Sequence, residues 1–146
     1  MKRRYLIVTS VAVLLIAFIA GPRTPVIHQP QSVELPADLP GYLAKAEAAY
    51  PDITPGAEKT ILWAHQDHQQ TELAIVYLHG FSATRQETAP LSDDLAKSLG
   101  ANLFYTRLAG HGRSSAAMGE ASAGDWLNDA EEALAIGQRQ IGRAHV

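Results

Sequence analysis

Two apolar runs that each end in a glycine turn constrain the fold of this chain most. The first covers residues 73–78 and breaks at His79-Gly80-Phe81-Ser82, and the second covers residues 101–107 and breaks at Gly110-His111-Gly112. Between them, apolar residues recur at helical spacing. Two strand-like runs separated by a helix predict a βαβ unit with parallel strands. Because ligands bind at the carboxyl ends of parallel strands, both turns are candidates for a functional site.

Periodicity and capping residues predict the other elements. We expect a helix over residues 39–50 and a strand over residues 59–65, which pairs antiparallel with the strand at 73–78. Further helices are expected over residues 88–99 and 125–138. In the last helix, the predicted inner stripe is Trp126, Ala130, Ala133, Leu134 and Gly137. The side chains predicted to face water there are Asp129, Glu131 and Glu132.

Residues 1–21 are typical of a membrane-directing segment. Lys2-Arg3-Arg4 is followed by residues 5–20, which carry no charge. A signal peptide has an apolar region of about 7–15 residues, and a membrane-spanning helix needs about 20. We expect a signal anchor, with a cleaved signal peptide as the alternative. The positive-inside rule then places the rest of the chain outside the cytoplasm, as a periplasmic or extracytoplasmic domain. Residues 5–21 would hold this domain at the inner or plasma membrane. If the signal is cleaved, the domain would be secreted.

Composition excludes some partners. The net charge is −3 and no basic stripe exists, so nucleic acid is not expected as a partner. Cysteine is absent, which excludes disulfides and thiolate metal sites. His65, Asp67 and His68 lie close together, but two histidines without a third placed ligand are better explained as a polar loop than as a zinc site. No metal is expected.

The turn at residues 79–82 has features that acyl-transfer chemistry needs. Gly80 permits an unusual backbone path that turns amide N–H groups towards a ligand. Acyl-transfer enzymes hold the developing oxyanion with two such amides. The amide of Phe81, directly after His79-Gly80, is the natural first donor. His79 is better explained as a support that packs beneath the turn than as a general base, since no nucleophile or orienting residue accompanies it.

Together the two turns resemble the N-terminal part of an α/β-hydrolase. The similarity is greatest to the serine-aminopeptidase and monoacylglycerol-lipase-like group of esterases and lipases. It implies a three-layer α/β/α sheet over residues 57–139, preceded by the membrane-directing helix and by a Pro-rich linker with a short helix over 22–56. It also implies that the Phe81 amide is half of the oxyanion hole. The residues that it places in the active-site turns are His79, Gly80, Ser82, Arg85, Gly110, His111 and Gly112.

The nucleophile of such an enzyme is missing. Serine hydrolases of this fold place it in a G-x-S-x-G elbow, followed by the acid and the base, and no such elbow occurs here. The near matches at residues 80–84 and 112–116 have the wrong final residue or no preceding strand. We therefore expect a domain truncated before its nucleophile. Residues 140–146 resemble a translated sequencing adapter, which suggests a gene fragment.

The expected function is that of a truncated serine hydrolase. The intact protein would cleave a small-molecule ester or amide without a cofactor, and the fragment would be inactive. One alternative is a non-catalytic, membrane-anchored α/β binding module or pseudoenzyme. A nucleotide-binding domain is a weaker alternative, because residues 110–115 match the G-x-G-x-x-G pattern only in part.

Overall fold

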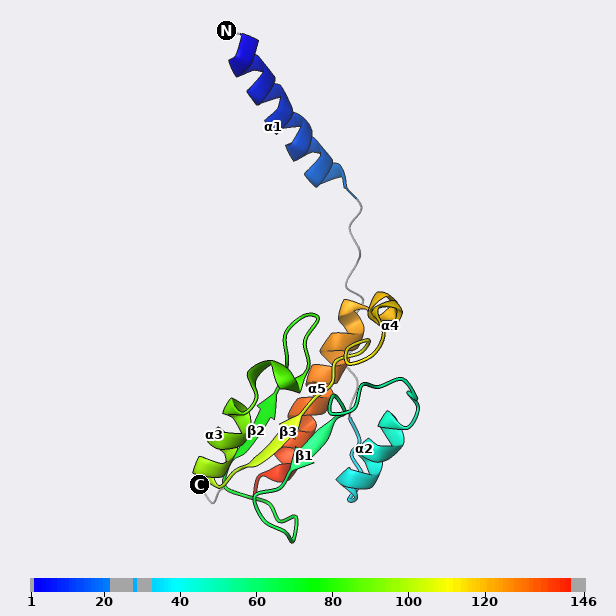
Figure 1. Ribbon diagram of the computed structural model, residues 1–146, viewed down its shortest axis with the longest axis vertical. Coiled ribbons are helices and arrows are strands. Elements are labelled where there is room, and N and C mark those ends of the chain that lie inside the picture. The colour runs from blue at the N-terminus through cyan, green and yellow to red at the C-terminus, as the bar shows by residue number, and fades with distance from the viewer. Residues whose placement is uncertain (1, 22–27, 29–32, 143–146) are drawn as a thin grey trace.

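The computed structural model describes residues 2–21, 28 and 33–142 (Figure 1). The helices are α1 (Lys2–Ala20), α2 (Leu39–Glu47), the 3₁₀ helix η1 (Arg85–Thr88), α3 (Leu91–Leu99), α4 (Ser115–Glu120) and α5 (Ala123–Gln140). The strands are β1 (Thr60–Leu62), β2 (Ala74–Tyr77) and β3 (Asn102–Tyr105).

The three strands form one mixed sheet in the order β1-β3-β2. β2 and β3 are parallel, with Val76 beside Phe104, and α3 connects them, so the predicted βαβ unit is confirmed. The predicted pairing of the first two strands is wrong, because β1 pairs antiparallel with β3 instead. The Asn102 side chain helps to fix this arrangement. It accepts a hydrogen bond from Ala64 N at 2.9 Å and donates to Gln69 O at 2.9 Å, which holds the connection after β1 against the start of β3.

Side chains of β3 alternate between two layers of the core. Phe104 packs with Ala133 and Ile136 of α5, and with Leu39 and Leu43 of α2. Leu103 and Tyr105 point to the other face, where they pack with Ala96 of α3. The sheet is therefore covered by α3 on one face and by α2 and α5 on the other.

Gly137 lets α5 lie close to the sheet. A Cβ added there would come within 2.4 Å of Val76 Cγ2 in β2. Contacts this short do not occur between real side chains, so the packing requires a glycine at this position. Leu134, which the sequence placed on the same inner stripe, is 57% exposed, and Ile136 is buried in its place.

Local capping follows the sequence. Asp38 caps α2 by accepting from Gly41 N at 2.9 Å. Gly100 ends α3 in the left-handed conformation with φ of 59°. Ser122 and Asp125 form a capping box at the start of α5. These three boundaries are set by side-chain and backbone chemistry that acts over a few residues.

The predicted fold class is wrong. The part of the chain that the structure describes has five α-helices and a small mixed sheet of three strands, not the N-terminal part of a three-layer α/β-hydrolase sheet behind a membrane-directing helix. Among the described residues, no helix combines the length and apolar character needed to cross a membrane. In α1, cationic residues occupy the first turn, and the uncharged remainder is shorter than the roughly 20 residues of a spanning helix.

Parts of two other predictions fall outside the described residues. These are residues 22–27 and 29–32 of the predicted linker, and residues 143–146 of the tail. The described part of that tail continues from α5. Thr71 N donates to Gln140 O at 3.0 Å and Gly142 N donates to Thr71 O at 2.9 Å, which places Ile141 in a parallel bridge beside Thr71.

Candidate functional site

The turns that follow β2 and β3 meet through two buried histidines. His79 is 5% exposed, His111 is 1% exposed, and their ring centroids lie 4.8 Å apart. His79 Nε2 accepts from Leu108 N at 3.1 Å, across the gap to the second turn. His111 Nε2 accepts from Ser82 N, also at 3.1 Å, in the opposite direction. Each turn therefore holds the other through one histidine.

These hydrogen bonds define the proton positions on both rings. Because each Nε2 accepts an amide proton, each neutral ring carries its own proton on Nδ1. His79 Nδ1 then donates to Gly80 O at 3.0 Å, and His111 Nδ1 donates to Ala109 O at 3.1 Å. Burial lowers the pKa of His79 below its ordinary value of 6.5, and the neighbouring His111 lowers it further. The geometry and the pKa of His79 both favour the neutral ring.

The amide of Phe81 differs from its neighbours. Gly80 N donates to Glu87 Oε2 at 3.2 Å, and Ser82 N donates to His111. Ala83 N donates to Gly80 O at 3.2 Å. Within the described residues, Phe81 N–H has no such acceptor. An unpaired amide beside two anchored ones is a donor that a ligand oxygen can use.

Positive φ angles occur in both turns, but not at Gly80. Ser82 has φ of 60°, Gly110 of 76° and Gly112 of 66°. The left-handed step of the first turn is thus made by Ser82, and Gly80 is not among the described glycines with a positive φ. At Gly110 a Cβ would lie 2.6 Å from Ala117 O, so this position needs glycine for space as well as for conformation.

The side chain of Phe81 belongs to an aromatic cluster at the first turn. The Phe81 ring is 75% exposed and lies edge-on to His111 at 6.1 Å and to Trp126 at 5.9 Å. Trp126 Nε1 donates to Ala109 O at 3.0 Å, which ties α5 to the second turn. The exposed Phe81 ring and the half-buried Trp126 ring therefore belong to one aromatic cluster with His111.

The other predicted residues of the first turn have different surroundings. Arg85 Nε donates to Gly56 O at 2.8 Å, and its guanidinium lies 5.3 Å from the centre of the Tyr105 ring. These contacts assign Arg85 to packing between η1 and β3. Ser82 is exposed, and its described polar contact is made by its backbone.

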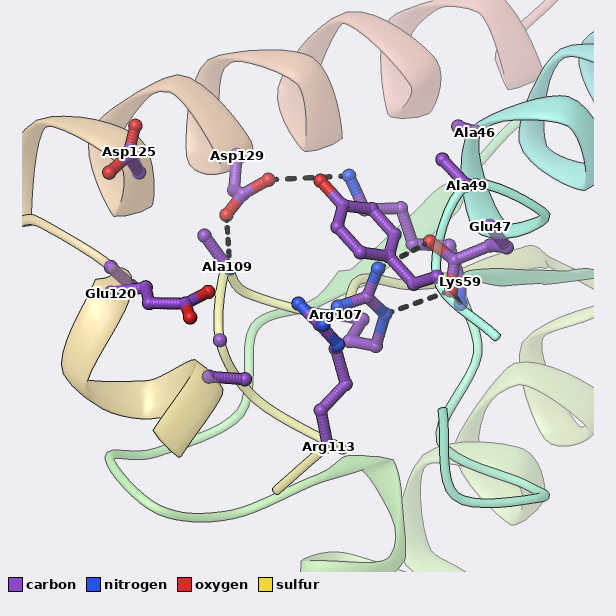
Figure 2. Close-up of a pocket in the computed structure, with 14 residues that line it drawn as sticks. Ala46, Glu47, Ala49, Lys59, Arg107, Ala109, Arg113, Glu120, Asp125 and Asp129 are labelled. Atoms are coloured by element: carbon purple, nitrogen blue, oxygen red, sulfur yellow. Dashed lines mark hydrogen bonds and ion pairs between the residues drawn. The ribbon is translucent and has the colours of Figure 1, made fainter. Parts of the chain in front are cut away.

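A separate cavity of about 470 Å³ lies behind the second turn (Figure 2). Of the predicted site residues, only Gly110 lines it. Its other lining residues are Ala46, Glu47, Ala49, Tyr50, Lys59, Arg107, Ala109, Arg113, Ala117, Glu120, Ala121, Asp125 and Asp129. Sequence reasoning missed this cavity because its residues come from five separate parts of the chain.

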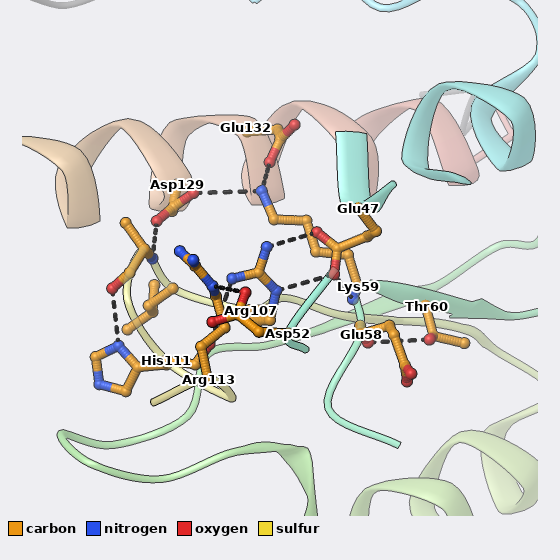
Figure 3. Close-up of polar contacts among 12 residues, drawn as sticks. Glu47, Asp52, Glu58, Lys59, Thr60, Arg107, His111, Arg113, Asp129 and Glu132 are labelled. Carbon is orange, nitrogen blue, oxygen red and sulfur yellow. Dashed lines mark hydrogen bonds and ion pairs between the residues drawn. The ribbon is translucent and has the colours of Figure 1, made fainter. Parts of the chain in front are cut away.

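Paired charges line this cavity (Figure 3). Lys59 Nζ contacts Asp129 Oδ1 at 3.3 Å and also bonds Glu132 Oε2. Desolvation raises the pKa of Asp129, while the charge of Lys59 acts in the opposite direction. The sequence placed Asp129 and Glu132 on a water-facing surface, but their side chains are only 15% and 12% exposed. That prediction is wrong because Lys59 draws both carboxylates inward.

Two arginines complete the lining of the cavity. Arg107 forms a bidentate ion pair with Glu47. Its Nε donates to Glu47 Oε2 at 2.9 Å, and its Nη2 donates to Glu47 Oε1 at 2.8 Å. The guanidinium groups of Arg107 and Arg113 lie 5.0 Å and 4.6 Å from the centre of the Tyr50 ring. Arg113 also pairs with Asp52 at 2.7 Å. Each cationic side chain of the cavity therefore already has a carboxylate partner.

The predicted loop at residues 65–68 contains a ring contact. Trp63 stacks on His68 with ring centroids 5.0 Å apart. Across the described ranges, no group of three or more histidine, aspartate or glutamate side chains is placed to hold a metal ion.

Comparison with known proteins identifies no family. No protein-family model matches the chain, and no curated protein matches it. The resemblance of the two turns to α/β-hydrolases therefore stays a prediction from their motifs.

Proposed function

We propose that this chain supplies the oxyanion-binding turn of a serine hydrolase that acts on a small-molecule ester or amide. The observation that carries the proposal is the unpaired Phe81 amide. It lies at the carboxyl end of β2, between two amides that are already bonded to side chains. A fixed donor without an internal acceptor is what a developing oxyanion requires.

The chemistry divides between this turn and groups that the 146 residues do not contain. A serine hydroxyl, deprotonated by a histidine, would attack the substrate carbonyl carbon. The carbonyl oxygen would then gain negative charge and accept a hydrogen bond from Phe81 N–H. One such donor contributes about 10²–10³-fold to kcat. In this proposal the nucleophile, acid and base come from residues outside the given sequence, because no G-x-S-x-G elbow occurs within it.

The exposed Phe81 ring and the half-buried Trp126 ring suit the substrate class. Phe81 and Trp126 form an apolar wall next to the place where the carbonyl oxygen would lie. An acyl chain or an aromatic leaving group could pack against this wall. An anionic substrate would gain little from the negative faces of these rings.

The test compares two changes at one position in the full-length protein. Phe81→Pro removes the N–H, whereas Phe81→Ala keeps the N–H and removes the ring. We expect Phe81→Pro to lower kcat for p-nitrophenyl acetate about 10²–10³-fold, and Phe81→Ala to act mainly on KM. Circular dichroism verifies that both variants fold.

Two results would contradict the proposal. One is an equal loss of kcat in both variants, which would remove the oxyanion role of the amide. The other is a full-length protein that neither hydrolyses activated esters nor reacts with a fluorophosphonate probe. That second result would exclude the serine hydrolase class itself.

A further inference from the structure

We propose that His79 and His111 form a reciprocal, acid-sensitive latch that fixes the two turns against each other and orients the Phe81 amide. We call this pair the histidine latch. The latch is defined by contacts within the described residues, and only its effect on catalysis rests on the proposed function.

The reciprocity of the latch is its main feature. His79 belongs to the turn after β2 and bonds Leu108 N in the turn after β3. His111 belongs to the turn after β3 and bonds Ser82 N in the turn after β2. A single histidine would join the two turns at one point. Two bonds in opposite directions fix both the separation and the orientation of the turns.

The latch acts directly on the chain around Phe81. Ser82 N, the amide that follows, is held by His111, and Gly80 N, the amide that precedes, is held by Glu87. The positive φ of Ser82 is uncommon for a residue with a Cβ and needs support from its surroundings. The bond to His111 provides that support, so its loss would allow the Phe81 amide to turn away.

Protonation would open the latch for a simple chemical reason. In a neutral ring Nε2 is an acceptor, but in an imidazolium both ring nitrogens are donors. A protonated His79 would direct an N–H at Leu108 N–H across 3.1 Å, and a protonated His111 would do the same to Ser82 N–H. The Nδ1 bonds to Gly80 O and Ala109 O would persist. Acid therefore breaks only the two bonds that join the turns.

Charged groups from several elements face the latch. Glu87 of η1 and Asp129 of α5 favour the protonated form of His79, whereas burial and the neighbouring His111 oppose it. Arg107 Nη1 donates to His111 O at 3.3 Å, which places a positive charge at the backbone of His111. The balance lowers the pKa of His79.

The pH dependence of the latch follows from this direction. The pKa of His79 is lower in the folded protein than in the unfolded chain. Such a base stabilises the fold at pH values above the pKa that it has in the unfolded chain. This stabilisation is lost as the pH falls from about 6.5 towards the lower, folded value. The bond from Leu108 N to His79 is therefore present at neutral pH and is lost in acid, below the ordinary histidine pKa of 6.5.

Glutamine variants test the latch without removing its acceptors. Glutamine Oε1 can replace Nε2 as the acceptor, but it does not titrate. The measurements are the amide ¹H shifts of Ser82 and Leu108 and the imidazole ¹⁵N shifts of the full 146-residue chain, followed from about pH 8 to about pH 5. In the unmodified chain, we expect Nδ1–H tautomers at neutral pH and a joint shift of both amides in acid.

Each variant has a distinct expected result. In His79→Gln the Leu108 amide should lose its pH response, and in His111→Gln the Ser82 amide should lose it. His111→Phe, which has no acceptor, should show the acid-form Ser82 shift at every pH at which it folds. Nε2–H tautomers at neutral pH, or amides that do not titrate in the unmodified chain, would overturn the latch. These NMR results do not depend on hydrolase activity, so they separate failure of the latch from failure of the proposed function.

Discussion

Replacing Lys59 with methionine tests whether the charges behind the second turn hold the fold together. Lys59 has an almost fully buried side chain, 10% exposed, and lies between the carboxylates of Asp129 and Glu132. Methionine fills similar space but carries no charge. The change would therefore leave two buried carboxylates facing each other without a cation.

The expected loss can be worked out from the contact distance. At an effective dielectric constant of about 20, two unit charges separated by 3.3 Å attract by about 5 kcal/mol. Desolvation of the three groups offsets part of this attraction in the native protein. Measured losses for removing one partner from a buried pair are about 3–5 kcal/mol. We expect a loss in this range for Lys59→Met at neutral pH.

The loss should shrink in acid. Burial raises the pKa of Asp129, and loss of the Lys59 charge would raise it further. A carboxyl group with a raised folded pKa stabilises the fold below its unfolded pKa, and this contribution disappears as the pH rises through the folded value. Lys59→Met should therefore be most destabilised at neutral pH and should recover part of its stability as Asp129 becomes protonated.

Urea unfolding followed by tryptophan fluorescence measures both effects. Lys45→Met on the exposed face of α2 is the matched control, since surface changes usually alter stability by less than about 0.5 kcal/mol. A Lys59→Met variant within about 1 kcal/mol of the unmodified chain at neutral pH would refute the argument, because the carboxylates would then not depend on Lys59.

Three further changes test the packing, the capping and the missing nucleophile. Gly137→Ala should cost about 1–3 kcal/mol in urea unfolding because its Cβ would collide with Val76, whereas Gly119→Ala, with open space around it, should gain about 0.5–1 kcal/mol. Ser122→Ala should lower the melting temperature through a loss of about 1 kcal/mol from the α5 cap. The 146-residue chain should show no acyl-enzyme burst with an activated ester; a stoichiometric burst that Ser82→Ala abolishes would instead make Ser82 the nucleophile.

Features determined by neighbouring residues could be predicted from the sequence. The apolar run at 73–78 contains β2, and the helix expected over residues 88–99 ends where α3 ends, at Leu99. The parallel pairing of β2 with β3 followed from the helix between them. In each case the physical cause acts within one element or one crossover.

Features determined by distant residues were missed. The placement of β1 beside β3 depends on the side chain of Asn102. This side chain accepts a hydrogen bond from Ala64 N, which is 38 residues earlier in the chain. Burial of Asp129 depends on Lys59, 70 residues away. One local signal did exist, because Asp129 stands three residues after Trp126 and four before Ala133, on the inner stripe of α5. The charge of Asp129 favoured a solvent-exposed position in the sequence analysis. Only a distant cation makes its burial possible.

The buried ion cluster of Lys59 and Asp129 and the first turn belong to one network of hydrogen bonds. Ala109 connects the two parts of this network. Asp129 contacts Lys59 with one carboxylate oxygen, and with the other it accepts from Ala109 N at 2.6 Å. The carbonyl of Ala109 accepts from His111 Nδ1 and from Trp126 Nε1. The ion cluster thus holds Ala109 at its N–H, and the carbonyl of the same residue orients the His111 ring. Because that ring in turn holds Ser82 N, charges buried behind the second turn help to set the direction of the Phe81 amide in the first.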